Sequence, residues 1–151
     1  MARALGLDFG TTNTVLALAE EADGATRSIP FTSDAGTTDT MRTALSFMKE
    51  GRSTASLRVE AGQAAIRLFV EHPGDCRFLQ SIKTFAASAA FQATIVHARK
   101  QTFEDLMEAF LRRLQAYAGN GWPSDVARLV VGRPVRFAGA NPDEQLALGG
   151  D

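Results

Sequence analysis

Residues 6–14, with the sequence GLDFGTTNT, hold the side chains of this chain that are best suited to chemistry. Asp8 is a carboxylate that follows an apolar run, and burying it costs free energy unless it faces a cation or hydrogen-bond donors. Gly10 permits unusual backbone angles and the close approach of a ligand. Thr11, Thr12 and Asn13 add hydroxyls, an amide and backbone N–H groups, and such a turn can form a small cavity for anionic oxygens. An acid beside such a cavity suggests Mg²⁺ shared with phosphates, an ion that usually keeps several of its waters.

The same spacing has a plainer interpretation. Asp in a Gly/Thr-rich turn commonly hydrogen-bonds nearby backbone amides and has no further role. The segment is neither a Walker loop nor a three-glycine dinucleotide motif, because it lacks both patterns. Spacing alone therefore leaves a phosphate site and an ordinary hairpin turn as open alternatives.

The flanking pattern predicts a β-hairpin that presents this segment. Apolar runs at Ala4 to Phe9 and Thr14 to Ala19 are joined by the Gly10–Asn13 link, which is typical of two strands and a tight turn. We expect a further strand at Ser28 to Thr32 and a loop from Ser33 to Thr40. Two more strands, paired with each other, are expected at Ala44 to Met48 and Leu57 to Glu60.

Two helices should support these strands. The first is predicted at Gly62 to Glu71 and ends before Pro73, because the residue before a proline avoids the α region. The second, Thr102 to Ala118, has apolar residues at the three-and-four spacing of one helical face, with Thr102 and Gly119 as its caps. A short strand of the buried type follows at Ala127 to Val131. This order predicts an α/β or α+β domain with the Leu5 to Ala19 hairpin central in a mixed sheet and the second helix packed on it.

Composition excludes several classes of function. The 151 residues include 45% hydrophobic and 22% charged residues and carry a net charge of −1, so no bulk field favours nucleic acid or an acidic membrane. No run of about 18 uncharged apolar residues is present, and we expect neither a membrane span nor a signal peptide. Cys76 is the lone cysteine, expected half-buried at a helix start, and with His72 and His97 it lacks the spacing of a metal site. Arg99, Lys100, Arg112 and Arg113 are expected on a solvated helix surface, and a cytoplasmic location is the default.

Residues 6–13 closely resemble the first phosphate motif of the seventy-kilodalton heat-shock chaperones, DnaK-like members of the actin-like ATPase superfamily. Further stretches resemble that family in the same order along the chain: Ala44-Leu45-Ser46-Phe47, Gly62-Gln63-Ala64-Ala65 with Pro73, Ser81-Ile82-Lys83-Thr84-Phe85, and Leu129-Val130-Val131 with Pro134. The sequence Gly132-Arg133-Pro134-Val135 is similar to that of the YegD-like branch of the family.

The resemblance implies an actin-like (ribonuclease H-like) α/β fold, of which this chain spans the N-terminal part of lobe I. The layout would be the hairpin of subdomain IA over about 1–35, subdomain IB over about 36–115, and a return to IA over about 116–151. A new helix is predicted at Asn141-Pro142, so we expect the chain to stop short of a complete domain. The family's second phosphate motif, its adenosine motif and the domain that grips unfolded polypeptide clients would follow Asp151.

The resemblance also implies roles for single residues. Asp8 would hold Mg²⁺ through water, and Gly10, Thr11, Thr12 and Asn13 would bind the phosphates of ATP or ADP. The family's catalytic lysine directly follows Gly-x-x-Ala, where this chain has Ile66, and isoleucine cannot donate to a phosphate. Arg67 is adjacent, but on a helix it points about 100° away. ATP hydrolysis is therefore expected to be slow, because losing such a cation commonly costs several kcal/mol of transition-state stabilisation.

Three interpretations remain open at this point. The first is an ATP-binding, chaperone-like protein, represented by part of its nucleotide-binding domain. The second is a nucleotide sensor or scaffold that keeps the fold without hydrolysis, as Ile66 suggests. The third is a sugar or acetate kinase of the same superfamily, which Thr12-Asn13 and Ile82-Lys83 disfavour. Pro134 resembles the proline that relays nucleotide state in the family, and a simple strand terminator is an equal alternative.

Overall fold

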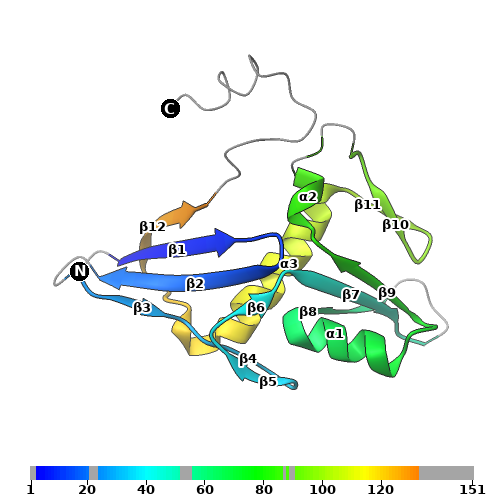
Figure 1. Ribbon diagram of the computed structural model, residues 1–151, viewed down its shortest axis with the longest axis horizontal. Coiled ribbons are helices and arrows are strands. Elements are labelled where there is room, and N and C mark those ends of the chain that lie inside the picture. The colour runs from blue at the N-terminus through cyan, green and yellow to red at the C-terminus, as the bar shows by residue number, and fades with distance from the viewer. Residues whose placement is uncertain (1–2, 21–23, 52–55, 87, 89–90, 133–151) are drawn as a thin grey trace, which may run out of the picture.

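A mixed β-sheet forms one half of the molecule (Figure 1). The computed structural model describes residues 3–132 apart from 21–23, 52–55, 87 and 89–90. Strand β1 (Arg3–Phe9) lies between β2 (Asn13–Glu20), which is antiparallel to it, and β12 (Val126–Val131), which is parallel. Strand β2 also pairs with β3 (Thr26–Ser28) and β6 (Met41–Arg42). The predicted hairpin is confirmed, and it is central in the sheet as expected.

A smaller antiparallel sheet forms the other half. Its middle strand β7 (Ala44–Lys49) pairs with β8 (Leu57–Ala61) and with β9 (Cys76–Gln80). The pairing predicted between β7 and β8 is thus confirmed. Two separate hairpins complete the strands: β4 (Phe31–Ser33) with β5 (Gly36–Thr38), and β10 (Thr94–Val96) with β11 (Arg99–Gln101).

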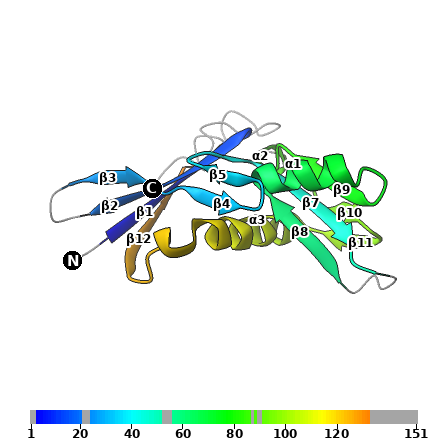
Figure 2. The ribbon, with the colours of Figure 1, turned by 90° about the horizontal axis from the view of Figure 1, so that it is seen from below.

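Helix α3 (Phe103–Ala118) packs on the hairpin and reaches the second sheet, so that both sheets share one core (Figure 2). Its Leu106, Phe110 and Leu114 are fully buried, and the Phe110 ring meets Phe9 edge-on at 5.4 Å between centroids. Each such side chain contributes about 1.5–3 kcal/mol of burial free energy. The helix begins where expected, since Thr102 caps it in a reciprocal capping box with Asp105.

Helix α1 (Gly62–Glu71) has the predicted bounds and packs on the β7–β9 sheet. The Ser46 hydroxyl donates to the Ala65 carbonyl oxygen at 2.6 Å, whereas Leu45 and Phe47, which alternate with Ser46, belong to the core shared with α3. Strand β7 is therefore covered on both faces. A four-residue helix, α2 (Lys83–Ala86), follows β9, and a 3-10 turn at Gly119–Gly121 follows α3.

Several sequence-based expectations require correction. The strand expected at Ser28 to Thr32 is divided into β3 and β4 around Pro30, and the loop expected from Ser33 to Thr40 contains β5. Cys76 begins strand β9 and not a helix, and it is half-buried as expected. Strands β3, β4 and β5 have three residues each, which is too few to show a clear alternation of apolar and polar residues.

The strand predicted as buried at Ala127 to Val131 is β12, and its end is exposed. Leu129, Val130 and Val131 are each more than half exposed, at 54%, 56% and 52%. Arg99 and Lys100 lie on strand β11 and not on a helix. Pro134 and the helix start predicted at Asn141 lie outside the described residues. Among the helices that the structure describes, none has the length and apolarity needed to cross a membrane.

Candidate phosphate-binding site

The turn between β1 and β2 is closed by a backbone hydrogen bond from Gly10 N to Asn13 O at 3.0 Å. A Cβ at position 10 would lie 2.3 Å from that same oxygen, so the tight turn requires glycine. Thr11, Thr12 and Asn13 are all exposed. Within the described part of the chain, neither the Thr11 nor the Thr12 hydroxyl has a hydrogen-bond partner. Both are therefore available to an external acceptor or donor.

Asp8 lies on the opposite face of β1 from Leu7 and Phe9, whose side chains are buried in the core. Its carboxylate is exposed and close to Gly132, where a Cβ would stand 3.6 Å from Asp8 Oδ1. No backbone amide among the described residues donates to this carboxylate. The geometry therefore disfavours the plainer interpretation in which Asp8 serves only to bond the turn amides.

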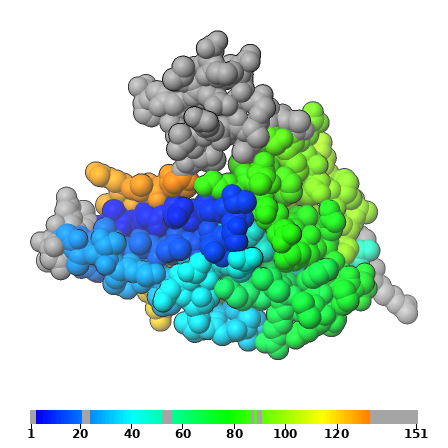
Figure 3. Space-filling model, viewed as in Figure 1, coloured from blue at the N-terminus to red at the C-terminus, as the bar shows by residue number. Residues whose placement is uncertain are grey.

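A polar pocket of about 170 Å³ opens beside the turn. Strand β9, helix α1 and the β6–β7 segment supply its other walls. Figure 3 shows the face on which the surfaces of the hairpin (blue), the β6 region (cyan) and the α1–β9 region (green) adjoin. The lining residues are Thr11, Thr12, Arg42, Thr43, Ala44, Ile66, Phe78, Gln80 and Ser81. The turn and Ile66, far apart in the sequence, thus face one pocket.

Strand β6 holds the turn and α1 in this arrangement. Arg42 pairs with Asn13 in the β2–β6 ladder, and Thr43 N donates to Thr12 O at 2.9 Å. On its other side, β6 contacts the start of α1. Gly62 has a positive φ of 64°, and a Cβ there would lie 2.4 Å from Met41 Cγ. The first turn of α1 is therefore seated against β6, and Ile66, one helical turn later, faces the pocket.

Arg67 faces away from the pocket, as its helical position predicts. Its guanidinium donates to Glu71 Oε1 at 2.9 Å and to the Asp34 carbonyl oxygen at 3.0 Å. The hydrogen bond to Glu71, together with the negative charges of Glu71 and Asp34, raises the pKa of Arg67 above its ordinary value. Arg67 is thus a surface cation that is already engaged, and it does not replace a lysine at position 66.

Ser81 forms part of the pocket wall with a left-handed backbone, at a φ of 56°. Its carbonyl oxygen accepts from both the backbone N–H of Thr84, at 2.9 Å, and the Thr84 hydroxyl, at 2.7 Å. A non-glycine residue in this region costs free energy, and such residues are concentrated at functional sites. The Ser81-Ile82-Lys83 block therefore contributes Ser81 to the pocket, while Lys83 starts helix α2.

A second polar cluster has a structural role. Glu60 on β8 is buried and accepts from the Tyr117 hydroxyl of α3, and it pairs with Arg58 at 3.1 Å and Arg113 at 3.6 Å. Arg113, which was expected on a solvated helix surface, is therefore tied to β8. His97 similarly contacts the Phe47 carbonyl oxygen, at 2.8 Å. Within the described residues, no group of three or more His, Cys, Asp or Glu side chains is placed to hold a metal ion.

No family model matches the sequence. The site is defined by its own geometry. That geometry brings together Asp8, Gly10, Thr11, Thr12 and Asn13 at one end of the hairpin, as the local sequence requires, and adds Ile66 from α1. Sequence reasoning missed Arg42, Gln80 and Ser81 as members of the pocket. Only Ser81 had a signal, because it begins a block that resembles a stretch of the chaperones.

Proposed function

We propose that this chain is the phosphate-binding part of an ATP-binding protein with an actin-like fold, similar to the heat-shock chaperones. The observation that carries the proposal is the pocket in which Thr11, Thr12 and Ile66 meet. The resemblance equates Ile66 with the family's catalytic lysine, which acts on a phosphate held by the paired threonines. A pocket shared by these positions is what that equivalence requires, and the sequence alone does not reveal it.

The residues present suit a nucleotide phosphate with Mg²⁺. The threonine hydroxyls are exposed and unengaged by the described protein, so they can hydrogen-bond phosphate oxygens. Asp8 is an exposed carboxylate at the same end of the hairpin and would hold Mg²⁺ through its waters. Bound Mg²⁺ would neutralise part of the phosphate charge. Gly10 keeps the turn tight, and Asn13 fixes its far end through the β2–β6 pairing.

Ile66 favours a second candidate, a nucleotide sensor or scaffold that binds without efficient hydrolysis. Its side chain is 36% exposed in the pocket and offers no donor to a phosphate. Transition-state stabilisation in phosphoryl transfer is largely electrostatic, so an apolar side chain at this position lowers the rate. Both candidates bind ATP or ADP at the same residues. They differ in turnover, and in whether unfolded polypeptide is a client of the whole protein.

Binding is tested by titrating the ¹⁵N-labelled chain with Mg-ATP and following backbone amide signals. We expect saturable shifts at Gly10, Thr11 and Thr12. The double variant Thr11→Val/Thr12→Val should lose most of this binding. The matched control is Thr26→Val, an exposed threonine on β3 that lies outside the pocket. Shifts that avoid the turn, or a double variant that binds like the wild type, would show that the nucleotide is not held here.

A further inference from the structure

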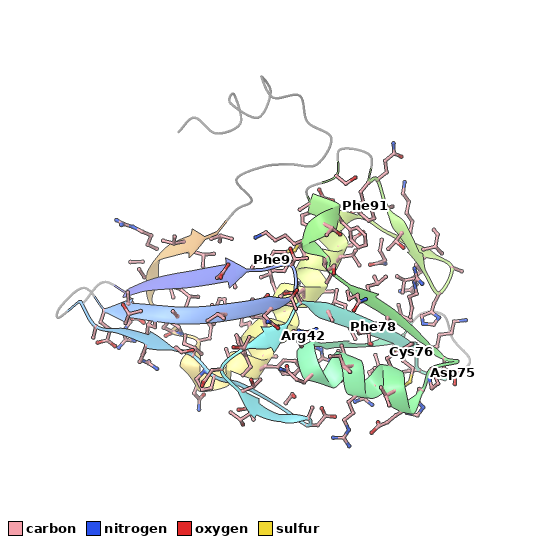
Figure 4. All side chains as sticks on the ribbon, viewed as in Figure 1. Phe9, Arg42, Asp75, Cys76, Phe78 and Phe91 are labelled. Atoms are coloured by element: carbon pink, nitrogen blue, oxygen red, sulfur yellow. The ribbon has the colours of Figure 1, made fainter. Side chains whose placement is uncertain are left out.

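We propose that Arg42 is a phosphate-binding residue of this pocket and supplies the positive charge that Ile66 does not. The inference rests on the proposed function, since it assumes that the Thr11–Thr12 turn holds phosphate. Arg42 is the one basic residue among the described residues that line the pocket. Figure 4 shows it on β6, between the turn end of the hairpin and α1.

The backbone at Arg42 is fixed relative to the turn by two contacts. Arg42 pairs with Asn13 in the strand ladder, and the next residue, Thr43, donates its N–H to the Thr12 carbonyl oxygen. The buried hydroxyls of Thr43 and Thr14 are also hydrogen-bonded to each other, at 2.9 Å. A side chain that starts from such a rigid strand is preorganised toward the turn, so less entropy is lost when it binds a ligand there.

The guanidinium has unused hydrogen-bonding capacity. Its Nη1 donates to the Asn13 side-chain oxygen at 3.2 Å, and a guanidinium carries five N–H donors in total. No carboxylate among the described residues forms an ion pair with Arg42, in contrast to Arg58, Arg67 and Arg113. An exposed, unpaired guanidinium beside two free threonine hydroxyls matches the fork geometry by which arginine binds phosphate oxygens.

The chemistry of the pocket selects the ligand class. Its polar members are hydroxyls, a carboxamide and one guanidinium, which suit an anion with several oxygens and do not suit an apolar group or a cation. Asn13 anchors the guanidinium at one nitrogen, so the remaining donors are left for phosphate oxygens in the pocket that the turn shares with Ile66.

The test uses the ¹⁵N-labelled chain with two probes, Mg-ATP and Mg-tripolyphosphate. In the wild type we expect the Arg42 Nε–H signal to shift together with the Thr11 and Thr12 amides. Arg42→Gln should weaken binding of both probes at least about tenfold, equivalent to about 1.4 kcal/mol. Arg42→Lys keeps the charge and loses the forked geometry of the guanidinium, so its affinity should lie between those of the wild type and Arg42→Gln. The matched control is Arg67→Gln, which removes the same charge from a side chain outside the pocket and should bind like the wild type.

The outcomes separate this inference from the proposed function. If Arg42→Gln binds within twofold of the wild type while Thr11→Val/Thr12→Val does not bind, the role of Arg42 is wrong and the phosphate turn stands. If neither probe shifts the turn amides of the wild type, the role of Arg42 and the proposed function are both wrong. If Arg67→Gln weakens binding as much as Arg42→Gln, general surface charge explains the effect and the assignment fails. If the Arg42→Gln chain misfolds, the wild-type protein alone still tests the inference, because its Arg42 Nε–H signal should shift on binding.

Discussion

At the scale of single residues, the pocket combines a turn that tolerates little change with a wall that tolerates more. Gly10 is closed in by backbone, since the atom nearest to a Cβ at this position would be the Asn13 carbonyl oxygen. Ile66 has open space before it, because its side chain is exposed toward the pocket. Substitutions at these two positions should therefore have opposite kinds of effect, one on stability and the other on ligand affinity.

Gly10→Ala is expected to destabilise the fold by about 1–3 kcal/mol, because a backbone atom at 2.3 Å cannot move without opening the turn. The measurement is the midpoint of chemical denaturation. The matched control is Gly74→Ala, since a Cβ there meets nothing within 4 Å and its φ is not positive. Equal midpoints for the two variants would mean that the turn can rearrange at little cost.

Ile66→Lys is expected to tighten Mg-tripolyphosphate binding several-fold without lowering the melting temperature. The side chain is 36% exposed, so an ammonium group there stays hydrated and avoids the cost of burial. It would place a second cation beside the turn. At the effective dielectric constant of a protein surface, the attraction between this cation and the phosphate still strengthens binding. Val70→Lys is the control, because Val70 lies on the same helix at 70% exposure and is outside the pocket. Under the proposed function, the same change should raise the single-turnover rate of ATP hydrolysis, and an unchanged rate in a well-folded variant would contradict the equivalence of Ile66 with the catalytic lysine.

At the scale of elements, the longer segments with a clear local signal were predicted, and most of the shortest strands were not. The end of helix α1 follows from the proline after it, and α3 follows from its apolar spacing and its caps. The hairpin follows from two apolar runs around a Gly-rich turn. Strands β5, β6 and β11 have only two or three residues each, too few to show alternation. Arg42 lies on one of these, which explains why its place beside Thr12 could not be read from the sequence.

The link between α3 and β8 depends on a tyrosine that must stay protonated. Burial raises the pKa of Tyr117 well above its ordinary value, and its hydrogen bond to Glu60 acts in the same direction. The unfolded chain ionises its tyrosine near pH 10, whereas the folded chain resists ionisation. The stability that this group contributes is therefore complete below about pH 10 and is lost as the pH rises above it.

Tyr117→Phe should remove this part of the alkaline loss of stability, and at neutral pH it should cost about 1 kcal/mol, the usual worth of one hydrogen bond. Because Tyr117 is the only tyrosine in the chain, near-ultraviolet absorption of tyrosinate reports on this residue alone. In the wild type, tyrosinate should appear together with the loss of circular dichroism. Ionisation at about pH 10 in a chain that is still folded would show that the side chain is not held by burial and Glu60.

At the scale of the whole molecule, the pocket beside the turn has the size expected of the proposed phosphate site and not that of a complete nucleotide site. The pocket beside the turn has a volume of about 170 Å³, below the roughly 300–1,000 Å³ of sites that enclose a drug-sized ligand. A larger hollow of about 740 Å³ runs along α3 and β12, but its walls are mostly apolar and include Leu7, Met107 and Val131. It lacks the hydroxyls and the unpaired guanidinium with which the smaller pocket could bind phosphate oxygens.

This difference in size leads to a prediction about affinity. If the chain contacts only the phosphates, the adenosine adds little, so Mg-ATP and Mg-tripolyphosphate should bind with dissociation constants within about tenfold of each other, a difference of about 1.4 kcal/mol. Both should lie above about 1 μM, equivalent to about −8 kcal/mol, because tight binding requires most of the ligand surface to be buried. Calorimetry or amide titration of the 151-residue chain measures both constants. Mg-ATP binding much tighter than tripolyphosphate would mean that this chain also grips the nucleoside, and the search for that second contact would begin at the walls of the pocket formed by Phe78 and Gln80.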